Sequence, residues 1–504
     1  MKRRNYLKTT LAGGAALMVP SLLRAATDSK TKPLRQAQSR PNILFIMTDQ
    51  QHDRMMSCAG NKWLKTPHLD GLAAEGLRFE KAYATNPVCV PSRISMATGM
   101  MPGRVGSASN KSKVKLASHI DENSLGKIMK RAGYDTFYGG KTHLSAQLDP
   151  RSDLGAGYDK FFSDQRDKLP AGCLKFITKE RDKPFFAVAS FINPHDICFA
   201  HKAHATGKSP VKNLYDEAMA LPLDELPPLP DNYGIQENEP SAIQANLSAT
   251  ATTPSLTMRN EYDEKAWRVN RYIYHRLTER VDGEIGQILD GLKKAGLEDN
   301  TLIVFTSDHG DMNASHRLAS KSFAYEESVG IPFIMKYKGV IPAGKVDSKH
   351  FVSSGIDILP TLCDYAGAEK PEHLIGKSLR PVAKGKDVAN WRKYVVSEGG
   401  KWRMLRTENY KYTTFSDPNS KESLVDMKKD PGEMRNLVDH PEYKQALREH
   451  RQLLAQWSDS TGDQEYYKFA RNDDGSSDYV PLPEEPATHN AKPNRKKKKG
   501  GKKS

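Results

Sequence analysis

Apolar residues gather in several short runs along the chain, and the segments between these runs carry helical patterns. Four runs are almost continuously apolar, at 42–47, 185–191, 302–305 and 331–335. Runs of this kind are typical of strands that are buried on both faces of a parallel sheet. Between them, apolar residues recur every three or four positions, most clearly at 263–295, which predicts a long amphipathic helix. Strands that alternate with helices predict an α/β fold, a sandwich around a mostly parallel central sheet.

Two regions depart from this alternation. Residues 200–260 are rich in Pro and Asn and show little periodicity, so we expect a long ordered loop beside the functional site, with a disordered insert as the alternative. From about Trp391 the pattern changes to short strands and a closing helix, at 394–397, 402–406, 410–414 and 443–457. This change predicts a smaller antiparallel sheet with a covering helix. We therefore expect a catalytic domain at 41–385 and a C-terminal subdomain at 386–480.

Polar side chains with metal-binding or acid–base chemistry follow several of the predicted strands directly. These residues are Asp49, Gln50, Lys141, His143, His195, Asp308 and His309. They come after the strands expected at 42–47, 136–140, 185–192 and 302–306. Ligands bind at the carboxyl ends of the strands in open α/β sheets, so we expect these four strand ends to meet in one site.

The basic residues of the chain are concentrated at its two ends. The net charge is +15, but residues 491–504 carry eight Lys and Arg and residues 1–26 carry five, in both cases without an acid. The body between them is therefore close to neutral, which argues against nucleic acid as a partner. We expect the Lys-rich tail at 481–504 to be disordered.

The first 26 residues have the features of a bacterial export signal. Arg3 and Arg4 precede an apolar stretch from 11 to 23, which is followed by small residues. This stretch is too short for a membrane helix and has the flanks of a twin-arginine signal peptide, with an ordinary amphipathic helix as the alternative. No Cys precedes Cys58, so no lipid anchor is expected at this end. We therefore predict a periplasmic or secreted protein, with residues 27–40 as a polar linker.

Cysteine spacing gives little sign of a disulfide framework or of a zinc site. The chain has five cysteines, at 58, 89, 173, 198 and 363, and none forms a C-x-x-C pair. One or two disulfides are compatible with an oxidising periplasm, but the spacing does not require them. Buried free thiols are the expectation.

Five separated motifs give the chain a specific resemblance. They are T-D-Q-Q at Thr48–Gln51, C-V-P-S-R at Cys89–Arg93, G-K-T-H at Gly140–His143, N-P-H-D at Asn193–Asp196 and S-D-H-G-D at Ser307–Asp311. In order and in strand-end placement, they resemble the motifs of the formylglycine-dependent, arylsulfatase-like (type I) sulfatases from Pro41 to about Trp457. The resemblance implies an alkaline-phosphatase-like sandwich and the hydrolysis of sulfate esters.

The resemblance implies a modified nucleophile and a metal site. Cys89 corresponds to the cysteine that a formylglycine-generating enzyme or an anaerobic sulfatase-maturing enzyme oxidises to 3-oxoalanine (formylglycine), whose hydrate attacks sulfur. Asp49, Gln50, Asp308 and His309, together with position 89, correspond to the ligands of a divalent cation, with Ca²⁺ expected and Mg²⁺ the alternative. Many family members have Asp in place of Gln50 and Asn in place of His309, so the metal preference stays open.

The family pattern also implies roles for the groups around the nucleophile. Arg93 would hold the modified residue, and Lys141 and Lys321 would bind the sulfate oxygens. His195 would protonate the leaving alcohol, and His143 would take the proton when sulfate is expelled. Taken singly, each of these His and Lys residues is equally compatible with an ordinary surface or capping position. Their joint match to the motifs favours the site.

Two other functions remain open at this point. Phosphonate monoester hydrolases and phosphodiesterases of the same superfamily share the modified cysteine, and a non-enzymatic polyanion binder would use the Lys-rich tail. For a sulfatase, we expect a sulfated carbohydrate substrate, either an algal polysaccharide fragment or a glycosaminoglycan. The residues that select the sugar are expected around 196–204, in the 205–260 region and in the C-terminal subdomain.

Overall fold

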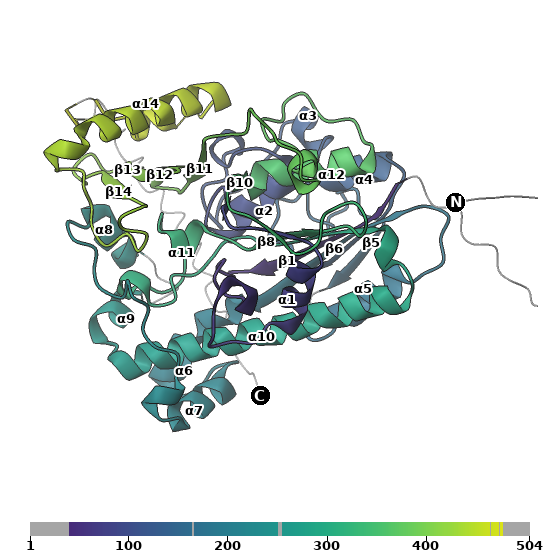
Figure 1. Cartoon of the computed structure of the whole chain (residues 1–504), viewed down its shortest axis with the longest axis horizontal. Helices are drawn as coiled ribbons and strands as arrows, with labels where there is room; N and C mark the ends of the chain where they lie inside the picture. Colours follow the sequence, from purple (N-terminus) through teal and green to yellow (C-terminus); the bar gives the residue numbers. More distant parts are fainter. Residues whose placement is uncertain (1–39, 164–165, 250–254, 464, 473, 477–504) are drawn as a thin grey trace, which may run out of the picture. The chain divides into compact units, whose positions relative to one another are not determined.

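The computed structural model describes residues 40–163, 166–249, 255–463, 465–472 and 474–476 (Figure 1). The expected signal peptide, almost all of the linker and the basic tail lie outside these residues. Within the described part of the chain, no helix combines the length and the apolarity needed to cross a bilayer.

An eight-stranded central sheet forms the body of the fold. In spatial order its strands are β5 (Lys160–Ser163), β4 (Asp135–Gly140), β6 (Phe185–Pro194), β1 (Asn42–Asp49), β7 (Thr301–Ser307), β8 (Phe333–Lys336), β2 (Leu77–Phe79) and β9 (Lys345–Asp347). The five strands from β5 to β7 are parallel, and β8 pairs antiparallel with both β7 and β2. The predicted α/β sandwich with a mostly parallel sheet is confirmed.

Helices cover both faces of this sheet (Figure 1). Every residue of β1 is buried, and alternate residues point to opposite faces. Ile43, Phe45 and Met47 pack in one core cluster, whose helical members come mainly from α4 (Leu125–Arg131) and α12 (Ser354–Ala366). Leu44 and Ile46 pack in a second cluster with α5 (Leu169–Ile177) and the long helix α10 (Glu264–Lys294). Burial on both sides explains why the strand is apolar without alternation.

The long helix was predicted almost to the residue because its sequence has a clear start signal. Asp263 is the N-cap of α10, and its side chain accepts a hydrogen bond from the backbone N–H of Ala266 at 2.8 Å. Apolar positions at three- and four-residue spacing then give the helix one continuous buried face, which includes Ile273, Leu277 and Val281.

The expected loop at 200–260 is wrong as far as this region is described. It contains α6 (Ala200–Thr206), α7 (Lys212–Ala220), α8 (Ser241–Ala249) and α9 (Ser255–Glu261). These helices are short, and α6 and α7 pack on α10. Each helix therefore needs only a few apolar contacts and leaves a weak periodic pattern in the sequence. Apart from short 3₁₀ turns, the other described elements before residue 390 are α1 (Pro67–Ala74), α2 (Cys89–Thr98), α3 (Ser118–Asp121), α11 (Glu326–Val329), α13 (Arg380–Ala383) and the pair β3 (Ala82–Tyr83) with β10 (Val352–Ser353).

The C-terminal part contains the predicted antiparallel sheet. Its strands are β11 (Tyr394–Glu398), β12 (Trp402–Thr407), β13 (Tyr410–Phe415) and β14 (Ser423–Asp426), and α14 (Lys444–Thr461) packs on it. The fourth strand was not predicted, and the other elements agree with the sequence pattern. All five cysteines are free; Cys89, Cys173 and Cys363 are buried as expected, whereas Cys58 and Cys198 are partly exposed.

A buried carboxyl group joins this second sheet to the segment after α2. Oε2 of Glu398 accepts a hydrogen bond from the backbone N–H of Gly103 at 2.7 Å. Burial raises the pKa of Glu398 from 4.5 to about 7, although Arg403 acts in the opposite direction. Between pH 4.5 and about pH 7, Glu398 keeps its proton in the folded chain and has lost it in the unfolded chain. The stability that this proton gives is therefore complete below pH 4.5 and is lost as the pH rises through about 7.

Replacing Glu398 with Gln should make the melting temperature less dependent on pH. The amide keeps an acceptor for Gly103 but does not ionise, so the loss of up to about 3 kcal/mol on raising the pH should disappear. Thermal unfolding from about pH 5 to pH 8 measures this difference. Glu408→Gln removes the same charge from an exposed position, and its melting temperature should depend on pH as that of the wild type does. A Glu398→Gln profile that parallels the wild type would contradict the buried-acid assignment.

Candidate active site

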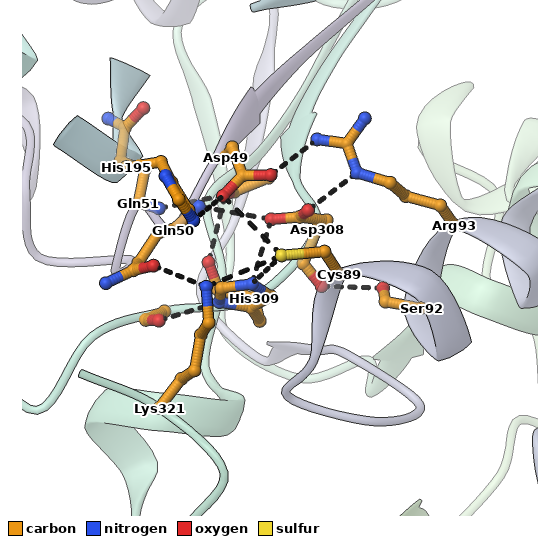
Figure 2. A network of polar contacts seen from close by, with 12 residues as sticks. Asp49, Gln50, Gln51, Cys89, Ser92, Arg93, His195, Asp308, His309 and Lys321 are labelled. Carbon is orange, nitrogen blue, oxygen red and sulfur yellow. Dashed lines mark hydrogen bonds and ion pairs between the residues drawn. The ribbon is translucent and has the colours of Figure 1, made fainter. Parts of the chain in front are cut away.

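The carboxyl ends of neighbouring strands bring the expected polar residues together. Thr48 of β1 is paired with Ser307 of β7, and Asp49 lies opposite Pro194 of β6, so the residues that follow all three strands emerge at the same edge. Cys89 enters this edge as the first residue of α2. Figure 2 shows the resulting cluster, in which the side chains from these segments point toward one another.

Cys89 lies at the centre of the cluster and is fully buried. Its Sγ is 3.2 Å from Nε2 of His309, 3.4 Å from Nζ of Lys321 and 3.8 Å from Nζ of Lys141. Burial and the carboxylate of Asp49 would raise the pKa of the thiol, but the two lysines and His309 outweigh them and lower it well below its usual value. Position 89 is therefore surrounded by cationic groups that favour negative charge on its side chain.

Arg93 holds the two carboxylates of the cluster in place. It lies one helical turn after Cys89, and its Nε donates to Oδ2 of Asp308 at 2.7 Å while its Nη2 donates to Oδ2 of Asp49 at 2.9 Å. Its Nη1 also donates to Oγ of Ser190 at 2.7 Å. Each carboxylate thus gives its Oδ2 to the guanidinium and leaves its Oδ1 for the rest of the cluster, where Oδ1 of Asp308 also accepts a hydrogen bond from the backbone N–H of Gln50 at 3.1 Å.

The donor atoms that face Cys89 fit a divalent cation. One ligand atom each of Asp49, Cys89, Asp308 and His309 lies within 4.8 Å of the others, and all four residues are buried. Nδ1 of His309 donates to the carbonyl oxygen of Gly310 at 2.9 Å, so Nε2 is the ring nitrogen directed at the cluster and would give up its proton when a cation binds there. Carboxylate oxygens with one imidazole are an acceptable set for Ca²⁺ or Mg²⁺.

Gln50 lies beside this set and connects it to Lys321. Its backbone has a positive φ of 70°, and its Oε1 accepts a hydrogen bond from Nζ of Lys321 at 2.6 Å. Its Nε2 donates to Oδ2 of Asp311 at 2.6 Å. The amide therefore brings a neutral oxygen into the cluster at a position where Asp would bring a negative charge.

His195 is the next residue of the cluster, on the 3₁₀ turn that follows β6 (His195–Phe199). Its Nε2 lies 4.0 Å from Oδ1 of Asp49, and a quarter of its side chain is exposed. Burial and the charge of Lys321 lower its pKa to about 3, so the free ring is neutral at pH 7. A bound anion would offset the charge of Lys321 and favour the protonated ring.

His143 is not brought into contact with the cluster. Residues 141–143 do not continue the strand, because β4 ends at Gly140 and His143 has a left-handed φ of 46°. The ring is exposed, and within the described residues no hydrogen bond or ion pair joins it to Cys89. Lys141 alone turns inward, with its Nζ 2.6 Å from Oδ2 of Asp49.

Several residues that support the cluster were not identified from the sequence. Oγ of Ser92 donates to the carbonyl oxygen of Asp308 at 2.6 Å, and Oγ of Ser190 donates to that of Lys141 at 2.7 Å. Ser92 lies within the C-V-P-S-R motif, which was a usable signal. Ser190 lies within an apolar strand and carries no such signal.

Comparison with protein families identifies the chain. Residues 41–368 match the family model described as Sulfatase. The chain belongs to the sulfatase family. The sulfatase is therefore a sulfuric ester hydrolase. Its residues 314–460 also match the model described as N-sulphoglucosamine sulphohydrolase, C-terminal.

Individual relatives of the sulfatase agree with this assignment. A Delta 4,5-hexuronate-2-O-sulfatase from Bacteroides thetaiotaomicron is 31% identical over 83% of the chain and 89% of the relative. Among solved structures, a 2-O GAG sulfatase superposes with a TM-score of 0.74 at 29% identity, over 85% of the sulfatase and 94% of that chain. A phosphonate monoester hydrolase from Agrobacterium radiobacter superposes with a TM-score of 0.69 at 22% identity, over 84% and 96% respectively. The last likeness shows only a common fold, so it does not favour the phosphonate alternative.

Proposed function

We propose that the sulfatase removes sulfate from a sulfated carbohydrate outside the cytoplasm, such as a glycosaminoglycan or an algal polysaccharide fragment. The observation that carries the proposal is the arrangement of Lys141 and Lys321 around the buried position 89, beside two carboxylates that fit a cation. Sugar sulfates are the substrates named for the relatives at 31% and 29% identity. The twin-arginine pattern of residues 1–26 supports export to the periplasm or the medium.

Position 89 would act as formylglycine, installed by a formylglycine-generating or anaerobic sulfatase-maturing enzyme. The hydrated aldehyde supplies a hydroxyl nucleophile that a thiol lacks. Asp49, Asp308 and His309, with the amide oxygen of Gln50, would hold Ca²⁺ or Mg²⁺, which supplies Lewis-acid polarisation of a sulfate oxygen. Arg93 keeps both carboxylates oriented toward position 89.

The remaining side chains would bind the ester and move protons. The Nζ atoms of Lys141 and Lys321 lie 3.8 Å and 3.4 Å from Sγ of Cys89. The two lysines would neutralise charge on the peripheral sulfate oxygens. His195 is partly exposed beside Asp49, where its ring can reach the leaving oxygen of an entering ester. The side chain of His143 is exposed after β4 and would need to turn inward to accept a proton when sulfate leaves.

A panel of sulfated oligosaccharides tests the substrate directly. Full-length sulfatase should release inorganic sulfate from at least one glycosaminoglycan or algal fragment, and identification of the desulfated product gives the position of the sulfate. Turnover of phosphonate monoesters with no release from any sulfated sugar would favour the other superfamily chemistry. Deleting residues 485–504 should leave turnover intact, whereas a polyanion binder that relied on the tail would lose its interaction.

Gln50→Asp should strengthen Ca²⁺ binding, because it adds a negative charge to the cluster of oxygen donors. Calorimetric titration of chelator-treated protein with Ca²⁺ measures this affinity independently of activity. Gln445→Glu adds the same charge on exposed α14 and serves as the control, which should bind Ca²⁺ as the wild type does. An unchanged affinity in Gln50→Asp, or activity that survives chelation, would show that the strand-end residues are not metal ligands.

A further inference from the structure

The segment that carries Lys321 has an unusual backbone conformation. Six residues between 313 and 322 have a positive φ, and none of them is Gly: Asn313 (45°), Ala314 (78°), His316 (55°), Arg317 (55°), Ser320 (69°) and Ser322 (83°). This left-handed conformation costs free energy in a residue with a side chain, so it persists only where the surrounding structure holds it. The 313–322 segment therefore depends on its contacts for its shape.

Hydrogen bonds from two different parts of the fold hold the ends of this segment. Where it begins, Nη1 of Arg271 on α10 donates to the carbonyl oxygen of Asn313 at 2.6 Å. Where it ends, Nε1 of Trp402 donates to the carbonyl oxygen of Ser322 at 3.0 Å. In the described part of the chain, no other group donates to that oxygen. Trp402 is the first residue of β12, so the C-terminal sheet holds this end of the segment.

The indole ring of Trp402 is itself held closely. The residue is 5% exposed and packs in a core cluster that also contains Phe323, the neighbour of Ser322 in the chain. Gly399, in the turn between β11 and β12, makes room for the ring, because a Cβ atom at this position would lie 2.4 Å from Nε1 of Trp402. The position of the N–H donor is therefore fixed by the packing around it.

The side chain of Lys321 reaches the reactive cluster from this segment (Figure 2). Its Nζ lies 2.6 Å from Oε1 of Gln50 and 3.4 Å from Sγ of Cys89. The residues on both sides of it, Ser320 and Ser322, are left-handed, so their φ angles set the direction in which the lysine leaves the backbone. Loss of the hydrogen bond at Ser322 would let the strained backbone relax and would move the ammonium group away from position 89.

We propose that Trp402 is a positioning residue for Lys321. Its indole N–H holds the carbonyl oxygen of Ser322, which keeps the strained segment in the conformation that presents the lysine to position 89. The C-terminal sheet thereby contributes to the geometry of the active site. That Lys321 binds sulfate rests on the proposed function; the dependence of its position on Trp402 does not.

Trp402→Phe removes the N–H donor and keeps an aromatic ring. Calorimetric titration of the full-length protein with inorganic sulfate, the product of a sulfatase, should show an affinity about five-fold lower than that of the wild type, the effect of one lost hydrogen bond. Trp391→Phe is the matched control. Nε1 of Trp391 donates to the carbonyl oxygen of Phe351 at 2.8 Å, outside the 313–322 segment, so this variant should bind sulfate as the wild type does.

Gly399→Ala tests the same contact without removing the N–H. Gly399 has no positive φ, so the backbone accepts Ala, but the new methyl group would displace the indole nitrogen and should also weaken sulfate binding. Thermal unfolding of each variant checks that it is folded. Lys321→Met should weaken sulfate binding while Lys141 remains to hold the anion. In that background, Trp402→Phe should cause no further loss of affinity, because the group that it positions is absent.

Three results would overturn the proposal. Wild-type affinity in both Trp402→Phe and Gly399→Ala would show that the segment keeps its shape without the indole. An equal loss with and without Lys321 would show that Trp402 does not act through the lysine. A wild type without saturable sulfate binding would leave Lys321 with no anion to be positioned for.

Sulfate release from the oligosaccharide panel is measured separately. Release by the wild type, together with unchanged sulfate affinity in both variants, would reject the positioning role alone. Weakened sulfate binding in Trp402→Phe, without release from any sulfated sugar by the wild type, would reject the proposed function alone.

Discussion

Cys89→Ala should abolish sulfate release while leaving the fold intact. The side chain lies within 4 Å of both lysines, so it is the group best placed to attack an ester that they hold. Without a nucleophile the covalent route is lost completely, and the lysines can only bind the substrate. Removing one sulfur atom from a cluster held by Arg93 should change the melting temperature little. Activity on a sulfated sugar and thermal unfolding, measured on the same sample, separate the two effects.

The same residue should carry the modification in active protein. Mass spectrometry of the peptide that contains Cys89 should show a loss of about 18 Da, the difference between thiol and aldehyde in this nucleophile chemistry. Cys58→Ala, which removes a thiol outside the cluster, is the control and should keep both the modification and the activity. Full activity in protein with an unmodified thiol at position 89 would refute the formylglycine assignment.

His195→Ala should lower turnover of a sulfated sugar by about 10²–10⁴-fold, and turnover of a nitrophenyl sulfate much less. A sugar alkoxide is a poor leaving group that needs a proton, whereas nitrophenolate leaves readily without one. The ratio of the two kcat/KM values therefore isolates proton donation from any general damage to the site. A merely structural role for His195 would lower both rates by the same factor.

His143→Ala is the matched comparison, because the proton that it would accept belongs to a step common to every ester. His143→Ala should lower turnover of the sulfated sugar and of the nitrophenyl sulfate by the same factor. If His195→Ala also lowered turnover of the two substrates by the same factor, the assignment of His195 as the acid and His143 as the base would be wrong. No effect in His143→Ala would mean that the exposed position seen here is its working position.

The sequence predicted the central sheet and most of the site because both depend on strong local signals. Continuous apolar runs indicate strands buried on two faces, and the residues after β1, β4, β6 and β7 follow from where those strands end. His143 could not be placed in this way, because its orientation depends on a left-handed backbone conformation rather than on strand alternation. The helices at 200–261 were missed since each is short and packs through few apolar residues, those of α6 and α7 on α10.

Features that depend on distant parts of the chain gave no signal in the sequence. The partners of Gln50 include Asp311 and Lys321, which lie more than 250 residues further along the chain. Glu398 and the backbone N–H of Gly103 that it binds are likewise 295 residues apart. Neither arrangement leaves a pattern in a local window, so tertiary structure is needed to find them.

The ion pairs of Arg93 with Asp49 and Asp308 affect the order in which the protein can fold and bind a cation. Two carboxylates that face each other in a buried site would repel, and an empty cation site would then oppose folding. Here a permanent internal counterion already separates them, so the chain can reach its final shape before any cation arrives. Folding can therefore precede cation loading, and the two events need not take place in the same compartment.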